Sequence, residues 1–167
     1  MRIALALIVP IGAALLQGAV SQIITIGGAF PNLPVLVAGS WAVAAGAGEA
    51  LWWAFVCGLA MDVLSAGPLG AFTVAVLPGV LIAGLGERPA AQPIPVITGA
   101  LLVGMAAALA QALYLGILAS LGHPLAPPPI AFSQTVGVGI YTGALALAIY
   151  PLARLGRRLT EKESPFS

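Results

Sequence analysis

The sequence predicts an all-α, polytopic membrane protein with about six transmembrane helices. Three observations support this fold class. Hydrophobic residues make up 60% of the 167 residues and charged residues only 7%, whereas a soluble domain carries about 25% charged residues. The mean hydropathy is +1.09, and no Lys, Arg, Asp or Glu occurs between Pro89 and Ala153. One small core cannot bury so much apolar surface, so the surroundings of this chain are lipid.

The first three spans are predicted at Ile3–Ile24, Leu33–Ala47 and Ala50–Ser65, because Gly, Pro and the rare charges mark breaks between apolar segments. The first segment could be read as a signal peptide, but it is longer than a signal-peptide core and no convincing cleavage site follows. The second and third segments are shorter than the usual span of about 20 residues. If they form one re-entrant pair, the chain has five spans.

The last three spans are predicted at Leu69–Leu85, Val96–Leu121 and Ile130–Leu155. A break at Gly67-Pro68 precedes the fourth span. The proline-rich loop at residues 122–129 precedes the sixth, and it cannot be helical throughout. Residues 1–155 are therefore predicted to form a single membrane domain, with residues 156–167 as a short basic and polar tail.

Basic residues predict the orientation, because Lys and Arg accumulate on the cytoplasmic side of a membrane. Six spans with a cytoplasmic N-terminus and C-terminus place every basic residue on that side. These are Arg2, Arg88, Arg154, Arg157, Arg158 and Lys162. The same topology puts Asp62 about one turn from the outer end of the third span. We therefore expect a multi-pass protein with both termini in the cytoplasm.

Small residues recur every fourth position in several spans, which lets neighbouring helices approach closely. Gly139 and Gly143 form such a pair in the sixth span, and we expect it to pack within the protein; docking of a partner helix is the alternative. Amide side chains within apolar spans are expected to hydrogen-bond neighbouring helices, with ligand binding as the alternative. These are Gln17, Gln111 and Gln134.

The sequence contains none of the patterns that most catalytic or metal sites need. His123 and Cys57 are the only residues of their kinds, so no metal-ligand spacing exists. Intramembrane catalysis by carboxylates needs two acids, and Asp62 is the only acid between Glu49 and Glu87. No basic patch is interleaved with aromatic residues. The sequence predicts a protein that is not an enzyme, uses no cofactor and binds no nucleic acid.

Asp62 stands out because a carboxylate costs about 3 kcal/mol at the centre of a membrane, and less near its surface. Gly58, Asp62 and Ser65 lie four and three residues apart, on one face of a helix. Gly67-Pro68 is expected to end this helix. The carboxylate could then accept hydrogen bonds from Ser65 or from the free N–H groups that start the next helix. The alternative is that Asp62 contacts a partner or a ligand.

The order Gly58-x-x-x-Asp62-x-Leu64-Ser65-x-x-Pro68-Leu69-Gly70 resembles the signature segment of the MreD family of rod shape-determining proteins. A second counterpart is Pro31-Asn32-Leu33, although Asn32 stands where an acid is common in that family. The resemblance is specific over about 40 residues.

The resemblance implies a non-enzymatic scaffold of the bacterial cytoplasmic (inner) membrane, needed for rod shape and lateral peptidoglycan synthesis. The implied partners are the bitopic protein MreC and, directly or through it, the MreB filament, RodA and its transpeptidase partner. The implied fold is similar to that of the six-helix substrate-binding subunits of energy-coupling-factor vitamin transporters. That similarity supplies the alternative function, a membrane-embedded vitamin-binding subunit, which would need several polar groups in an external pocket.

Overall fold

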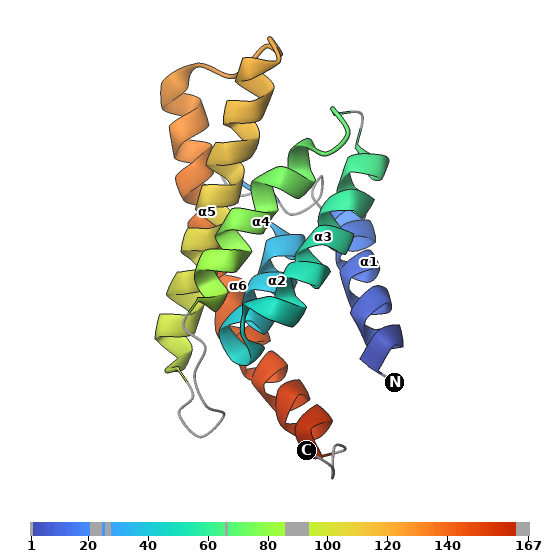
Figure 1. Ribbon diagram of the computed structural model, residues 1–167. Coiled ribbons are helices and arrows are strands. Elements are labelled where there is room, and N and C mark those ends of the chain that lie inside the picture. The colour runs from blue at the N-terminus through green and yellow to red at the C-terminus, as the bar shows by residue number, and fades with distance from the viewer. Residues whose placement is uncertain (1, 21–24, 26–27, 66, 86–93, 163–167) are drawn as a thin grey trace.

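A computed structural model describes residues 2–20, 25, 28–65, 67–85 and 94–162. These residues form six α-helices and no β-strand segment (Figure 1). The helices are α1 (Arg2–Val20), α2 (Leu33–Ala45), α3 (Ala47–Leu64), α4 (Ala71–Gly84), α5 (Val96–Ser120) and α6 (Pro128–Lys162). The all-helical class and the number of helices agree with the sequence prediction.

Each predicted span coincides with one helix, and the largest difference between prediction and structure occurs at the C-terminal end of α6. This helix begins inside the proline run, at Pro128, because proline is tolerated in the first turn, where no backbone N–H has an intrahelical partner. It continues past the predicted end at Leu155 as far as Lys162. Most of the segment predicted as a tail is therefore a continuation of the last helix. Residues 21–24 of the first predicted span lie outside the described part.

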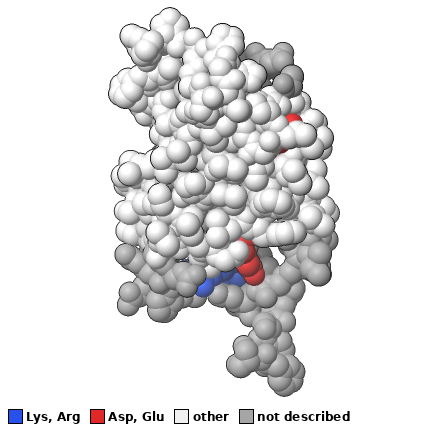
Figure 2. Space-filling view, turned by 45° about the horizontal axis from the view of Figure 1, so that its top comes forward, with Lys and Arg blue, Asp and Glu red and all other residues white. Residues whose placement is uncertain are grey.

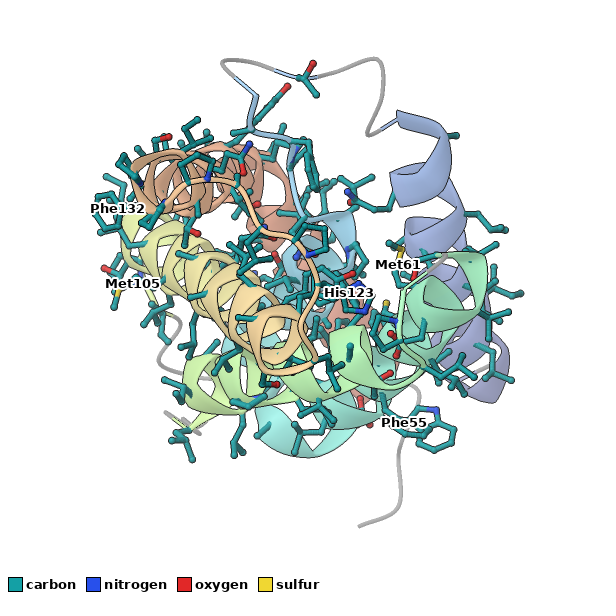
Figure 3. All side chains as sticks on the ribbon, turned by 90° about the horizontal axis from the view of Figure 1, so that it is seen from above. Phe55, Met61, Met105, His123 and Phe132 are labelled. Atoms are coloured by element: carbon teal, nitrogen blue, oxygen red, sulfur yellow. The ribbon has the colours of Figure 1, made fainter. Side chains whose placement is uncertain are left out.

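The shortest helix, α2, lies at the centre of the bundle. It packs against all five other helices, and α1, α3, α4, α5 and α6 follow one another around it (Figure 3). Most of its 13 residues are buried. The core around it consists largely of alanine and valine, including Val35, Ala38, Val76 and Ala107. Such small side chains let the helix axes approach closely.

The outer surface of the bundle is apolar. Large hydrophobic side chains point outward, among them Phe55, Met105 and Phe132, which Figure 3 shows at the periphery. In Figure 2 the face is almost entirely uncharged, with red and blue atoms mainly at its lower edge. By length and composition, α3, α5 and α6 are long enough to cross a membrane. The described apolar stretches of the other three helices, Leu7–Ala19, Leu33–Ala45 and Ala71–Gly84, are shorter. The chain has the surface of a helical membrane protein.

The helices differ greatly in length, and this difference places the polar residues. The α5–α6 hairpin stands above the other helices in Figure 1, whereas α2 and α4 have only 13 and 14 residues. At about 1.5 Å per residue, α2 and α4 extend for roughly 20 Å, which is less than the hydrocarbon thickness of about 30 Å. Within a membrane, at least one end of each such helix would lie in the apolar layer, where its free backbone groups need partners from the protein itself.

Candidate functional site

The turn between α3 and α4 is built from the residues of the Gly58–Gly70 segment. The N–H of Ala71 donates to the carbonyl of Pro68 at 3.2 Å, which closes a four-residue turn. Gly70 is third in this turn, with φ +88° and ψ −13°. A type II turn requires such a positive φ at its third position, and glycine adopts it without steric cost. Gly70 therefore lets the chain reverse directly into α4.

Asp62 lies in the last turn of α3 and caps the first turn of α4. Its Oδ1 accepts the N–H of Phe72 at 2.9 Å, and its Oδ2 accepts the N–H of Thr73 at 3.1 Å. The hydroxyl of Thr73 donates to the same Oδ2 at 2.5 Å. Asp62 is only 2% exposed, so this negative charge is balanced by oriented N–H dipoles rather than by water. The hydrogen bonds expected from the start of the next helix are present.

Gly58 brings the two helices together beside this cap. A Cβ atom on Gly58 would stand 2.6 Å from the Cα of Thr73, a distance that no side chain tolerates. Glycine is thus required here for the close approach of α3 to α4. Because Thr73 is also the residue that donates twice to Asp62, the glycine and the aspartate act on the same point of α4.

Ser65 does not bind the Asp62 carboxylate, so this alternative from the sequence is wrong. Its hydroxyl instead donates to the main-chain carbonyl of Asp62 at 3.5 Å and accepts the N–H of Gly67 at 3.4 Å. Both bonds are long, and Ser65 is exposed. Ser65 lies just past the end of α3, where an extended backbone turns its side chain toward the local main chain.

Tyr114 of α5 covers the turn, although its sequence context gave no reason to place it there. Its ring packs edge-on against Phe72, with ring centroids 5.7 Å apart. Its hydroxyl lies 3.2 Å from the position that a Cβ on Gly67 would occupy. The turn is therefore enclosed by α5 on one side, and the side chain at position 67 must be small.

A second polar cluster holds the N-terminus of α2, in the same way that Asp62 holds α4. Gln17 of α1 accepts the N–H of Leu33 at 2.7 Å, as expected for an amide that joins two helices. The side chain of Asn32 caps α2 by accepting the N–H of Val35 at 3.1 Å. The hydroxyl of Thr142 in α6 accepts the N–H of Asn32 at 3.0 Å. Thr142 was missed by the sequence analysis because a single threonine in an apolar helix carries no signal of its partner.

Gly139 and Gly143 pack within the protein. A Cβ on Gly104 of α5 would stand 2.7 Å from the carbonyl oxygen of Gly139 and 3.2 Å from the Cα of Gly143. The three glycines therefore form a close backbone contact between α5 and α6. The predicted internal use of this pair is observed, which leaves it unavailable to a partner helix.

The chemistry of these sites is structural. Each cluster supplies oxygen acceptors to helix N–H groups that are surrounded by apolar side chains. In lipid, an N–H group without an acceptor costs several kcal/mol. Within the described residues, no group of three or more His, Cys, Asp and Glu side chains could hold a metal ion. Both Asp62 oxygens are engaged by α4, so the carboxylate acts as a fixed helix cap.

Comparison of the chain with protein-family models, curated proteins and solved structures finds no match.

Proposed function

We propose that this chain is a non-enzymatic scaffold subunit of the bacterial cell-wall elongation machinery, similar to the MreD family. The observation that carries the proposal is the Gly58–Gly70 segment, which resembles the signature of that family at seven positions. In the structure, Gly58, Asp62, Pro68 and Gly70 all help to form the α3–α4 turn. A segment with this demanding geometry is a more specific pattern than apolar composition alone.

A scaffold role is supported by the way the chain uses its polar groups. The buried side chains of Gln17, Asn32 and Asp62 accept hydrogen bonds from backbone N–H groups of α2 and α4. A reacting group must be free to exchange protons or to touch a substrate. Here these polar side chains are engaged in capping helices, which favours a structural role for the protein over a catalytic one.

The proposed topology has six spans, with the N- and C-termini on the cytoplasmic side of the inner membrane. It is supported by the start of α1 and the end of α6, which lie at the same end of the bundle in Figure 1. It is also supported by Arg154, Arg157 and Arg158, which follow one another along that end of α6. The proposed fold, as the resemblance implies, is similar to that of energy-coupling-factor substrate-binding subunits.

The proposed partner is an MreC-like bitopic protein, and through it the MreB filament, RodA and its transpeptidase partner. The competing function is the vitamin-binding subunit of an energy-coupling-factor transporter. That function needs several free polar groups around a ligand, whereas Gln17, Asn32 and Asp62 are engaged in capping helices. The scaffold is therefore the better-supported reading.

The two functions are separated by co-expression and affinity purification from detergent. The tagged full-length chain is produced once with an MreC-like protein and once with the energising module of a vitamin transporter. A stoichiometric complex with the MreC-like protein is expected, and it should be lost when the membrane helix of that protein is replaced by polyleucine. A stable complex with the energising module, and none with the MreC-like protein, would overturn the proposal.

A cellular test uses the bacterium from which the chain comes. Depletion of the chain is expected to convert rods into rounded cells, and re-expression of the wild-type chain should restore rods. The Asp62→Leu variant is expected to fail in this assay, while Asp62→Asn restores rods at least in part. Normal rods after depletion would contradict the scaffold function.

A further inference from the structure

The arginines in the C-terminal part of α6 differ in their surroundings. Arg157 is the one that contacts the helix bundle. Nη1 of Arg157 donates to the carbonyl of Ala44, the second-last residue of α2 before Gly46. A cation at this position stabilises the free carbonyl groups at a helix C-terminus. Beside it, Cζ3 of Trp41 lies 3.6 Å from the position that a Cβ on Gly156 would occupy. This side of α6 is therefore fixed against α2.

Arg158 lies about 100° around the helix from Arg157. Arg154, three residues before Arg157 and four before Arg158, lies between them and borders the side that carries Arg158. The guanidinium of Arg154 lies 5.6 Å from the ring centroid of Tyr150. Tyr150 is itself buried, and its hydroxyl donates to the carbonyl of Ile94 at 3.1 Å. This anchored ring holds Arg154 in place, and Arg158 is exposed.

Exposed leucines lie on the same stretch as these arginines. Leu152 and Leu155 are three residues apart, and they are 61% and 54% exposed. A helix of 35 residues extends for about 52 Å, which exceeds the hydrocarbon thickness of about 30 Å. The end of α6 projects below the other helices in Figure 1, and blue atoms mark the lower edge in Figure 2. Leucines beside arginines at the end of a long helix are typical of a membrane interface.

We propose that Arg154 and Arg158, together with Leu152 and Leu155, form a binding surface for the headgroups of anionic phospholipids. Charge complementarity favours anionic headgroups as the bound molecules, because guanidinium groups bind phosphate oxygens through planar, paired hydrogen bonds. The leucines contact the adjacent glycerol and acyl region. The contact of Arg157 with α2 sets the rotation of the helix that turns this surface outward. The inference is independent of the proposed scaffold function.

The test measures lipid preference with the full-length chain in vesicles. The vesicles contain phosphatidylcholine with either spin-labelled phosphatidylglycerol or spin-labelled phosphatidylcholine, and the immobilised fraction of the electron paramagnetic resonance spectrum reports which lipid is bound. The wild-type chain is expected to prefer phosphatidylglycerol. Arg154→Gln and Arg158→Gln should each reduce this preference, by roughly 5-fold per arginine.

Arg157→Gln is the matched control, because it removes the same charge from the same turn of the helix. It should leave the lipid preference close to that of the wild type and lower thermal stability, since it breaks the contact with Ala44. Equal losses for Arg157→Gln and Arg158→Gln would mean that only overall charge matters, and would overturn the assigned surface. If a glutamine variant does not fold, Arg154→Lys with Arg158→Lys should retain the preference. A wild-type preference that persists at high salt would also overturn the proposal.

Discussion

Asp62 and Thr73 are joined by two hydrogen bonds that end on one carboxylate oxygen. The backbone N–H of Thr73 and its hydroxyl both donate to Oδ2 of Asp62, at 3.1 and 2.5 Å. Gly58 brings the Cα of Thr73 within reach by having no side chain. The end of α3 and the start of α4 therefore form one unit, and changes to any of these three residues should affect the same property, the stability of that unit.

Thr73→Val removes the hydroxyl and keeps the shape of the side chain. The Asp62 carboxylate then loses one of its three donors but keeps both backbone N–H groups. We expect a loss of about 1–2 kcal/mol in the free energy of unfolding in detergent, the upper end for hydrogen bonds inside membrane proteins. Thr135→Val is the control, because that hydroxyl donates to the carbonyl of Ala131 within its own helix. Equal effects of the two variants would contradict the assigned role of Thr73.

Asp62→Leu should be more damaging than Asp62→Asn. Leucine leaves the N–H groups of Phe72 and Thr73 without an acceptor among apolar side chains, at a cost of about 1–3 kcal/mol for each. Asparagine keeps one carbonyl oxygen and can satisfy part of the set. Thermal unfolding and the yield of folded protein should both rank wild type above Asp62→Asn and Asp62→Asn above Asp62→Leu. Similar stability for the leucine variant would show that the cap is dispensable.

Gly58→Ala should separate α3 from α4. The new Cβ would meet the Cα of Thr73 at 2.6 Å, so the helices must move apart and lengthen the bonds to Asp62. Overpacking of this kind costs about 1–3 kcal/mol. Gly116→Ala is the matched control, because a Cβ there meets nothing within 4 Å, and alanine favours a helix over glycine by about 1 kcal/mol. In detergent unfolding, Gly58→Ala is expected to lower the free energy of unfolding and Gly116→Ala to raise it.

Gln17→Leu should loosen the contact between α1 and α2. Its side-chain oxygen is the acceptor for the N–H of Leu33, and the described part of α1 packs mainly on α2 and α3. We expect limited proteolysis to cut the variant faster between α1 and α2, with a stability loss of about 1–2 kcal/mol. Gln111→Leu is the control, because Gln111 in α5 is only half-buried. Equal protease sensitivity of both variants would contradict the role of Gln17.

The helices could be predicted from the sequence, and their arrangement could not. Hydropathy and Gly-Pro breaks locate each helix because the membrane requires long apolar segments. The apolar residues of α2 cover all its faces, so nothing in the sequence indicates that it is the central helix. The Asp62 cap was predictable because its partners lie within about one helical turn of the break. The bond between Asn32 and Thr142 joins residues 110 positions apart, and only the folded chain reveals it.

Ser40 differs from the other buried polar residues, and its replacement should not cost stability. Its hydroxyl is fully buried in α2 and has no hydrogen-bond partner among the described residues. Burial of an unpaired hydroxyl is unfavourable by about 1–3 kcal/mol, so Ser40→Ala removes a cost and leaves only a very small gap. We expect a free energy of unfolding equal to or higher than that of the wild type. Thr142→Ala, which removes a hydroxyl that does accept a hydrogen bond, should lower it. A clear loss for Ser40→Ala would instead mean that the hydroxyl has a binding partner in the membrane.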